Sequence, residues 1–313
     1  MRALIVTNMY PSREHPALGS FVHDQVQALR RIPEVELELF TFAPGSGSPA
    51  AYARPAAHLH RRFRHRRFDV VHAHYGLTAW PALAAPARFH AVTLHGTDLA
   101  HPRSRAITLA VLRWVDLVAT VSEPLSSEIP RWATRRRPVV LPCGVDMDRF
   151  RPIPRGDARA ALGLDSNRPH VLFPANPRRP EKRFDRARAV AGDAMLLTLV
   201  DIEPRDVPLW VNAVNAVLVP SEREGFGLGV LEALACDVPV LATPTGVAPV
   251  ALAGVAGALC RPFDADVWRA ALAPHLAAAD PRIAGRAHAE PYCTDRMARE
   301  VVAAWQALSG VDG

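Results

Sequence analysis

Cysteine is scarce in this sequence, and this narrows the classes of fold that the chain can form. Only Cys143, Cys236, Cys260 and Cys293 occur, and no two of them form a CxxC pair. This spacing argues against a disulfide framework and against a structural zinc site. We therefore expect reduced thiols, as in proteins of the cytosol.

Long apolar runs are also missing. A membrane-spanning helix needs about 18 consecutive apolar residues, and the best candidate, 106–121, is interrupted by Arg113 and Asp116. No signal peptide is recognisable, because Met1 and Arg2 are followed directly by the strand-like run 3–6. We expect a cytoplasmic protein without a transmembrane segment.

The basic residues are unevenly distributed in a chain with a net charge of +6. Five arginines fall within 61–67 and three more occupy 135–137. One interpretation is two solvated loops. The other is a patch that holds the protein near an anionic acceptor or, as a peripheral protein, at anionic lipid on the inner face of the plasma membrane. Nucleic acid ranks below both, because no recognition motif or aromatic platform accompanies the charge.

Short apolar runs with little polar alternation recur along the chain and alternate with helical patterns. Such runs are typical of strands buried on both faces of a parallel sheet. In 21–32 the apolar residues Val22, Val26 and Leu29 recur at spacings of four and three, as on the buried face of a helix. We predict an α/β fold with two doubly wound, Rossmann-like domains. The expected strands are 3–7, 36–41, 69–73, 91–94, 117–121, 139–141, 171–174, 196–200, 216–219, 238–242 and 258–260.

The length and one linker-like segment predict the domain organisation. A chain of 313 residues is sufficient for two domains of about 150 residues each. The segment 148–156 is polar and rich in proline, so the expected domains are 1–150 and 151–313. A final helix is expected at about 294–308, and it could pack back on the first domain.

The segment 222–235 has the strongest pattern for ligand binding. It follows an expected strand, and ligands of open α/β sheets bind outside the carboxyl ends of the strands. A helix that begins near Gly227 would present free N–H groups to a phosphate. Glu224 precedes this helix and Glu232 lies on it, roughly 10 Å apart at 1.5 Å per residue. That is too far to share a proton and suits two parts of one extended ligand. The alternative is two unrelated glutamates.

This segment resembles the E-x7-E motif of family 4 glycosyltransferases, with Glu224 and Glu232 at its ends. The resemblance implies a GT-B architecture, with two Rossmann-like domains facing across a cleft and the donor bound between them. It implies that Glu224 approaches the donor sugar and that Glu232 binds the ribose hydroxyls. The donor-binding residues implied between them are Gly225, Phe226, Gly227 and Leu228.

Other segments match the same family. The stretch 173–183 resembles the loop that contacts the donor diphosphate, with Lys182 and an arginine, for which Arg178 is preferred to Arg179. Two fixed cations there would offset the charge that develops on the leaving nucleotide. In the first half, Gly19 resembles the glycine of the N-terminal loop beside the phosphates. His95 resembles the histidine that faces the donor sugar.

A metal site is a competing interpretation of the histidines. His72 and His74 alternate on one expected strand, and His95 could neighbour Asp98. A His-x-His pattern alone is weak in a chain with 13 histidines. The resembling family needs neither metal nor other cofactor, because the helix start, the arginine and the lysine neutralise the diphosphate.

The resemblance implies a retaining transfer of a hexose-type sugar from a UDP- or GDP-sugar. The acceptor would be a glycan, a lipid-linked glycan or a small molecule, and members that build bacterial cell-surface polysaccharides look most similar. Two alternatives stay open: a catalytically reduced module that only binds nucleotide-sugar, and a sugar-nucleotide epimerase. The stretches 42–67 and 184–214 are short for the family, and 247–250 lacks the usual glutamate. These departures motivate the first alternative, and the second ranks lower because the Glu224–Glu232 stretch fits transferases better.

Overall fold

The computed structural model describes residues 1–43 and 50–310, which form two compact units. Unit 1 joins Met1–Gly144 to Thr294–Gly313, and unit 2 is Val145–Cys293. The expected ranges, 1–150 and 151–313, differ from these units mainly in the final helix, which belongs to unit 1. Of the shortened stretch 42–67, residues 44–49 lie outside the described residues.

The sheet of unit 1 has six parallel strands in the order β2-β1-β3-β4-β5-β6. Because β1 lies between β2 and β3, the chain leaves it first to one side and then to the other. Such a reversal creates a ligand-binding position at the carboxyl ends of the strands. The strands are β1 (Arg2–Thr7), β2 (Glu36–Thr41), β3 (Phe68–His74), β4 (Ala87–Leu94), β5 (Leu117–Thr120) and β6 (Val139–Val140).

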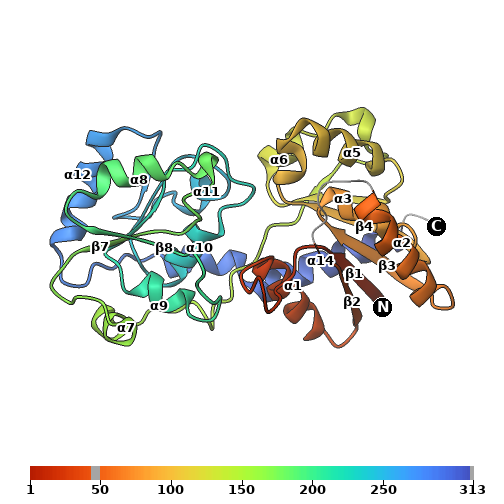
Figure 1. Cartoon of the computed structure of the whole chain (residues 1–313), viewed down its shortest axis with the longest axis horizontal. Helices are drawn as coiled ribbons and strands as arrows, with labels where there is room; N and C mark the ends of the chain where they lie inside the picture. The colour runs from red at the N-terminus through yellow and green to blue at the C-terminus, as the bar shows by residue number, and fades with distance from the viewer. Residues whose placement is uncertain (44–49, 311–313) are drawn as a thin grey trace. The chain divides into compact units, whose positions relative to one another are not determined.

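Helices cover both faces of this sheet (Figure 1). Helices α1 (Ser20–Arg30) and α14 (Thr294–Ser309) lie side by side on one face, although they come from opposite ends of the chain. Helices α3 and α5 lie on the other face, where α3 contacts both β3 and α2. The remaining helices of the described part of unit 1 are α2 (Ala50–Phe63), α3 (Gly76–Ala82), α4 (Thr97–Ala100), α5 (Pro102–Leu112), α6 (Glu123–Ser127) and the 3-10 turn η1 (Arg131–Ala133).

The sequence of α14 explains why the chain returns to unit 1. Its buried residues Met297, Val301, Trp305 and Leu308 recur at spacings of four, four and three, which gives one apolar face. This face shares a core cluster with apolar residues of α1, β1 and β3, and Trp305 is fully buried there. Burying a large apolar side chain contributes about 2 kcal/mol or more, so the helix is an integral part of this unit.

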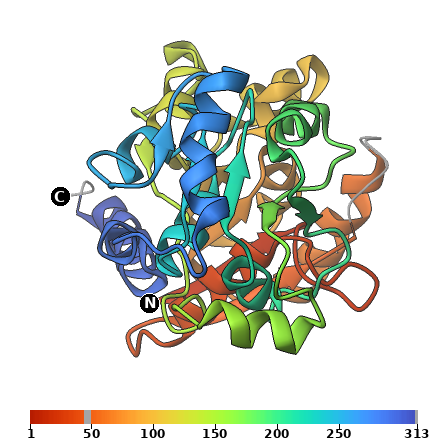
Figure 2. The same cartoon turned by 90° about the vertical axis from the view of Figure 1, so that its left-hand side faces the viewer.

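The sheet of unit 2 has five parallel strands in the order β11-β10-β9-β7-β8. Helices α8 (Phe184–Ala191) and α12 (Ala265–Ala277) share a core with one face, in which Phe173 and Trp268 are the largest buried side chains. Figure 2 shows α12 in blue in front of this sheet. The strands are β7 (His170–Phe173), β8 (Met195–Thr198), β9 (Ala216–Val219), β10 (Val240–Ala242) and β11 (Leu259–Cys260).

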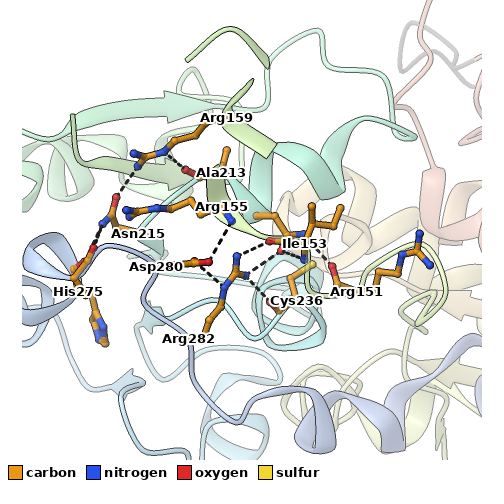
Figure 3. A network of polar contacts seen from close by, with 12 residues as sticks. Arg151, Ile153, Arg155, Arg159, Ala213, Asn215, Cys236, His275, Asp280 and Arg282 are labelled. Atoms are coloured by element: carbon orange, nitrogen blue, oxygen red, sulfur yellow. Dashed lines mark hydrogen bonds and ion pairs between the residues drawn. The ribbon is translucent and has the colours of Figure 1, made fainter. Parts of the chain in front are cut away.

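Helices α9 and α10 lie on the opposite face, and α13 packs against α10 (Figure 1). The C-terminal end of α10 is held by Arg282, which donates to the Cys236 carbonyl at 2.9 Å and to the Ile153 carbonyl at 2.6 Å (Figure 3). The segment that contains Ile153, before helix α7, is thereby fixed to the rest of unit 2. The remaining helices of the unit are α7 (Arg155–Leu162), α9 (Val207–Asn212), α10 (Leu228–Ala235), α11 (Ala248–Ala251), α13 (Arg286–Ala289) and the 3-10 turns η2 (Pro180–Lys182) and η3 (Glu290–Tyr292).

Every expected strand is present; 36–41 and 216–219 have the expected bounds, and the others have shifted ends. The strand expected at 238–242 begins only at Val240, because Asp237 adopts a left-handed φ of 55° and Val238 donates back to the Ala233 carbonyl of α10. Part of the basic run at 61–67 is not a loop, since Arg61 and Arg62 lie in the last turn of α2. Within the described residues, no helix has the length and apolarity needed to cross a membrane.

Candidate active site

The candidate site of unit 2 lies where β7 and β9 end. These strands pair in parallel, so the loops that follow them, 174–183 and 220–227, leave the same edge of the sheet. The Glu222 N–H donates to the Glu181 carbonyl at 2.9 Å. The two segments that the sequence singled out are therefore joined through their backbones.

Lys182 and Glu224 form the centre of this site. The Lys182 Nζ lies 2.6 Å from the Glu224 Oε2, and the two side chains are only 13% and 9% exposed. The Ser221 hydroxyl donates to the other oxygen, Oε1, at 2.7 Å. Ser221 is itself buried, so the carboxylate is fixed on both sides. Sequence reasoning missed Ser221, although its place directly after an expected strand was a usable signal.

The identity of residue 182 is unusual for this chain. Lys182 is the single lysine of a sequence that otherwise uses arginine for every basic position. An ammonium is a compact point charge with three rotatable donors, whereas a guanidinium is a planar fork with fixed donor directions. A lysine at this one place fits a small anionic partner that is approached end-on, such as a phosphate oxygen or the Glu224 carboxylate.

Helix α10 begins beside this ion pair. Gly227 is its N-cap, with a φ of 96° and no side chain that caps the helix. The first N–H groups of such a helix are open to an anion, and the helix dipole adds a partial positive charge. Glu232 lies on the same helix and is partly buried. The start of the helix lies beside Glu224, since a Cβ on Gly227 would be 3.7 Å from the Glu224 Cγ.

The loop 224–227 is fixed by the turn at Gly246. A Cβ on Gly246 would lie 2.2 Å from the Phe226 carbonyl oxygen, and its φ is 57°. The same carbonyl accepts a hydrogen bond from the Val247 N–H at 2.7 Å. Only glycine allows this close approach. The turn at 245–246 therefore determines the path of the loop that carries Glu224.

The three arginines around Lys182 have different partners. The Arg179 guanidinium pairs with Glu181 at 2.7 Å, and Arg183 bridges Asp185 and Glu222. The hydrogen bonds to Asp185 and Glu222 raise the pKa of Arg183, and Arg183 in turn lowers the pKa of Asp185. Arg178 is exposed, and its guanidinium makes no hydrogen bond or ion pair with the described residues. Unlike Arg179 and Arg183, Arg178 is not paired with a carboxylate, so its charge is available to a ligand.

Gly19 and His95 come together in unit 1. Gly19 is the N-cap of α1, with a φ of 66°, and a Cβ there would lie 2.2 Å from the Met9 carbonyl oxygen. Phe21, two residues further, packs its ring against His95 at 4.8 Å between centroids. His95 directly follows β4, and the buried Asp98 carboxylate accepts from its backbone N–H at 2.6 Å.

A row of histidines lies behind His95. The His74 Nδ1 is 3.0 Å from the His95 Nε2, and His72 stacks on His74. Burial lowers the pKa of His72 and His95 well below the usual value and that of His74 to about 3. Burial raises the pKa of Asp98, while N–H groups of Gly76 and His95 oppose that shift. The Asp98 carboxylate beside these rings is occupied by backbone donors from Gly76, His95 and Gly96. The described ranges, 1–43 and 50–310, hold no group of three or more ligating side chains placed to bind a metal.

The comparisons with known proteins agree on one class of enzyme. The family model described as Glycosyltransferase Family 4 matches residues 7–149, and the model described as Glycosyl transferases group 1 matches residues 171–277. A D-inositol 3-phosphate glycosyltransferase of Mycobacterium avium is 30% identical over 294 residues, which cover 76% of this chain and 69% of that protein. The chain belongs to the family 4 glycosyltransferases.

Solved structures show the same fold. Sucrose-phosphate synthase from Thermosynechococcus elongatus has a TM-score of 0.74 at 17% identity, with 99% of this chain and 100% of that one covered. HepE from Anabaena, solved in complex with UDP-glucose, has a TM-score of 0.70 at 15% identity, with 97% and 99% covered. The predictions of an α/β GT-B fold and of a nucleotide-sugar glycosyltransferase of the hexosyltransferase type are confirmed.

Proposed function

We propose that unit 2 binds the diphosphate of the donor with Lys182 and Arg178 and the donor sugar with Glu224. The observation that carries this is the Lys182–Glu224 ion pair beside the uncapped start of α10. The backbone of 225–228 contacts the diphosphate and sugar, and Glu232 binds the ribose hydroxyls. Gly19 and His95 are the ligand contacts proposed for unit 1. This assigns a role to each residue that the family resemblance implied.

The chemistry proposed is a metal-independent transfer that retains the anomeric configuration. As the bond between sugar and diphosphate breaks, negative charge develops on the leaving oxygen. Lys182, Arg178 and the helix N–H groups are cations or dipoles, so they stabilise that charge. The acceptor oxygen bonds to the anomeric carbon on the face from which the diphosphate departs, and the leaving phosphate oxygen takes the proton of the acceptor hydroxyl. No side chain then has to act as a strong base.

The donor proposed is a UDP-hexose, with a GDP-sugar as the alternative. UDP-glucose is the ligand named for the similar HepE structure, and this supports the first choice. The acceptor proposed is a small polyol or sugar hydroxyl, as the D-inositol 3-phosphate in the relative's name suggests. A glycan or lipid-linked glycan is the alternative acceptor.

The single lysine gives a direct test of the donor site. Reductive methylation with 13C-formaldehyde labels Lys182 and the N-terminal amine and keeps their charge. Lys182→Arg identifies the Lys182 signal by its loss. We expect UDP and UDP-glucose to shift that signal, and a ligand at 100 times its Kd to add about 2.7 kcal/mol of stability. If no nucleotide shifts the Lys182 signal and none stabilises the protein, the proposal is overturned.

Turnover separates the enzyme from a module that only binds. Donor consumption and release of nucleoside diphosphate are measured with a panel of polyol and glycan acceptors. Product formation with one acceptor supports the transferase. Binding to Lys182 without product for any acceptor, and without slow donor hydrolysis, would favour the catalytically reduced module.

Peripheral contact with an anionic membrane is also proposed, through unit 1. Trp114 and Trp132 are 62% and 63% exposed, and the Arg113 guanidinium joins them by donating to the Trp132 carbonyl at 3.2 Å. The arginines 135–137 follow directly. Tryptophans beside cations suit the interface of a bilayer with anionic headgroups.

The membrane proposal is tested by sedimentation with vesicles of phosphatidylglycerol or of phosphatidylcholine. We expect binding to the anionic vesicles only, and loss of binding in Trp114→Ala/Trp132→Ala. Val250→Ala, at an exposed apolar residue of unit 2, is the control. Equal binding of the double variant and the native protein would assign the contact elsewhere, and Arg61→Ala/Arg62→Ala then tests the end of α2.

A further inference from the structure

Three imidazole rings form a row at the carboxyl end of β3 and β4. His72 and His74 lie on the same side of β3, because side chains alternate along a strand. Their rings stack with 5.2 Å between centroids and 6° between planes. The rings of His74 and His95 stack at 5.3 Å and 22°. The row connects the buried core under α14 to His95, the residue proposed to face the ligand.

Trp305 determines the protonation of the first ring. Its indole Nε1 lies 2.9 Å from the His72 Nδ1. An indole N–H can only donate, so the His72 Nδ1 must be an acceptor without a proton. The proton of this neutral ring is then on Nε2, which donates to the Thr93 hydroxyl at 2.8 Å. His72 therefore has both nitrogens satisfied in a single tautomer.

One proton lies between the second and third rings. The His74 Nδ1 and the His95 Nε2 are 3.0 Å apart, and burial keeps both rings neutral, so one nitrogen donates and the other accepts. The other nitrogen of His74, Nε2, is buried and has no hydrogen-bond partner. If His95 donated, His74 would carry its proton on that Nε2 as a buried, unpaired N–H.

The opposite direction avoids this orphaned donor. If His74 donates from Nδ1, its Nε2 carries only a lone pair. Buried N–H groups without a partner are rarer in proteins than acceptors without one. The proton of His95 then resides on Nδ1. No hydrogen bond of the described residues uses that Nδ1, and it is not among the buried unpartnered atoms.

We propose that His74 is a positioning residue, which donates its Nδ1–H to the His95 Nε2 and so presents the His95 Nδ1–H as a donor to an oxygen of the bound ligand. The ligand chemistry that this recognises is a sugar hydroxyl or another neutral oxygen acceptor. Only this ligand role rests on the proposed function. The tautomer itself is a property of unit 1 and can be measured without any substrate.

The first test is the tautomer of each histidine in the native protein. Long-range 1H–15N correlation spectra of protein labelled with 15N-histidine distinguish protonated from unprotonated ring nitrogens. We expect His72 protonated on Nε2, and His74 and His95 both protonated on Nδ1. A spectrum with His95 protonated on Nε2 would overturn the proposal, whether or not the enzyme is active.

Two substitutions then separate positioning from packing. In His74→Asn the amide NH2 lies where Nδ1 was and can still donate, so we expect the His95 signature and kcat/KM within about twofold of native. In His74→Leu no donor remains, so we expect His95 to lose its fixed tautomer and kcat/KM to fall about three- to tenfold, as for one lost hydrogen bond. An unchanged His95 signature in His74→Leu would contradict the proposal. If that variant does not fold, the native and His74→Asn spectra decide.

Discussion

Lys182 and Glu224 neutralise each other across 2.6 Å, and both side chains are largely buried. A donor diphosphate therefore has to compete with Glu224 for the ammonium, and the released carboxylate becomes available to the sugar. We predict that Glu224→Gln lowers kcat at least tenfold but leaves the Kd of UDP unchanged or smaller. Lys182→Ala is expected to lower kcat at least tenfold and to weaken UDP as well.

The contrast between these two variants is the informative measurement. Calorimetric titration with UDP gives the Kd, and product release gives kcat. Ser221→Ala, which removes one hydrogen bond to the same carboxylate, is the intermediate case, with a loss of a few-fold in kcat. Weaker UDP binding in Glu224→Gln would show that the carboxylate does not compete with the diphosphate.

Arg178 and Arg179 provide a matched pair for the second cation. Both side chains carry the same charge and lie in the same loop, but Arg179 is paired with Glu181 and Arg178 is not. Charge-assisted hydrogen bonds contribute about 1.5–3 kcal/mol, so Arg178→Ala should lower kcat/KM by roughly tenfold or more. Arg179→Ala should change it by less than threefold. The reverse order would make Arg179 the residue on the diphosphate.

Much of the fold could be predicted because strong local signals agreed with it. The apolar runs located every strand, and the amphipathic pattern at about 294–308 located the last helix. The strand at 238–242 was placed two residues early, because the left-handed turn at Asp237 and the bond from Val238 to Ala233 are not encoded in hydrophobicity. Arg61 and Arg62 were predicted to lie in a loop, because the run of charged residues hid the apolar pattern of α2.

The site was less predictable than the fold. The family motif pointed to Glu224 and Lys182, but their direct contact depends on the pairing of β7 with β9, which spacing does not reveal. Ser221 bonds to Glu224, 3 positions away, and Trp305 bonds to His72, 233 positions away. The second of these is a tertiary contact that no local pattern contains. Side chains that position other side chains were therefore the residues that sequence reasoning missed.

Gly246 should be intolerant of any side chain. In Gly246→Ala the new Cβ would lie 2.2 Å from the Phe226 carbonyl oxygen, in addition to adopting a positive φ. Gly254→Ala is the control, because its φ of 75° is also positive but nothing lies within 4 Å of its Cβ. Left-handed strain alone costs about 1 kcal/mol. We expect Gly254→Ala to lose about that amount with normal turnover, and Gly246→Ala to lose more and to have little activity. Equal effects would show that the loop 224–227 adapts.

Arg282 is expected to be important for the stability of unit 2. Its guanidinium donates to the carbonyls of Cys236 and Ile153 and pairs with Asp280 at 2.9 Å (Figure 3). Removing it leaves partly buried acceptors without a donor, so we predict that Arg282→Ala destabilises the protein by roughly 2–4 kcal/mol. Arg269→Ala, at an exposed arginine of α12, should cost less than about 1 kcal/mol. Thermal or urea unfolding measures both, and similar losses would contradict a special role for Arg282.

The buried histidines should make the free energy of unfolding depend on pH between about 6.5 and 3. Burial lowers the pKa of His74 to about 3, so in this range the unfolded chain binds a proton at His74 that the folded protein does not. Stability is therefore full above pH 6.5 and falls as the pH decreases, by up to about 1.4 kcal/mol per pH unit for each such group. His74→Asn removes the group that takes up this proton on unfolding. The slope of the free energy of unfolding against pH should therefore be smaller in this variant near pH 5. His15→Asn, at an exposed histidine, is the matched control substitution. Urea unfolding at several pH values gives both slopes, and an identical slope for the native protein and His74→Asn would mean that His74 is protonated in the folded state.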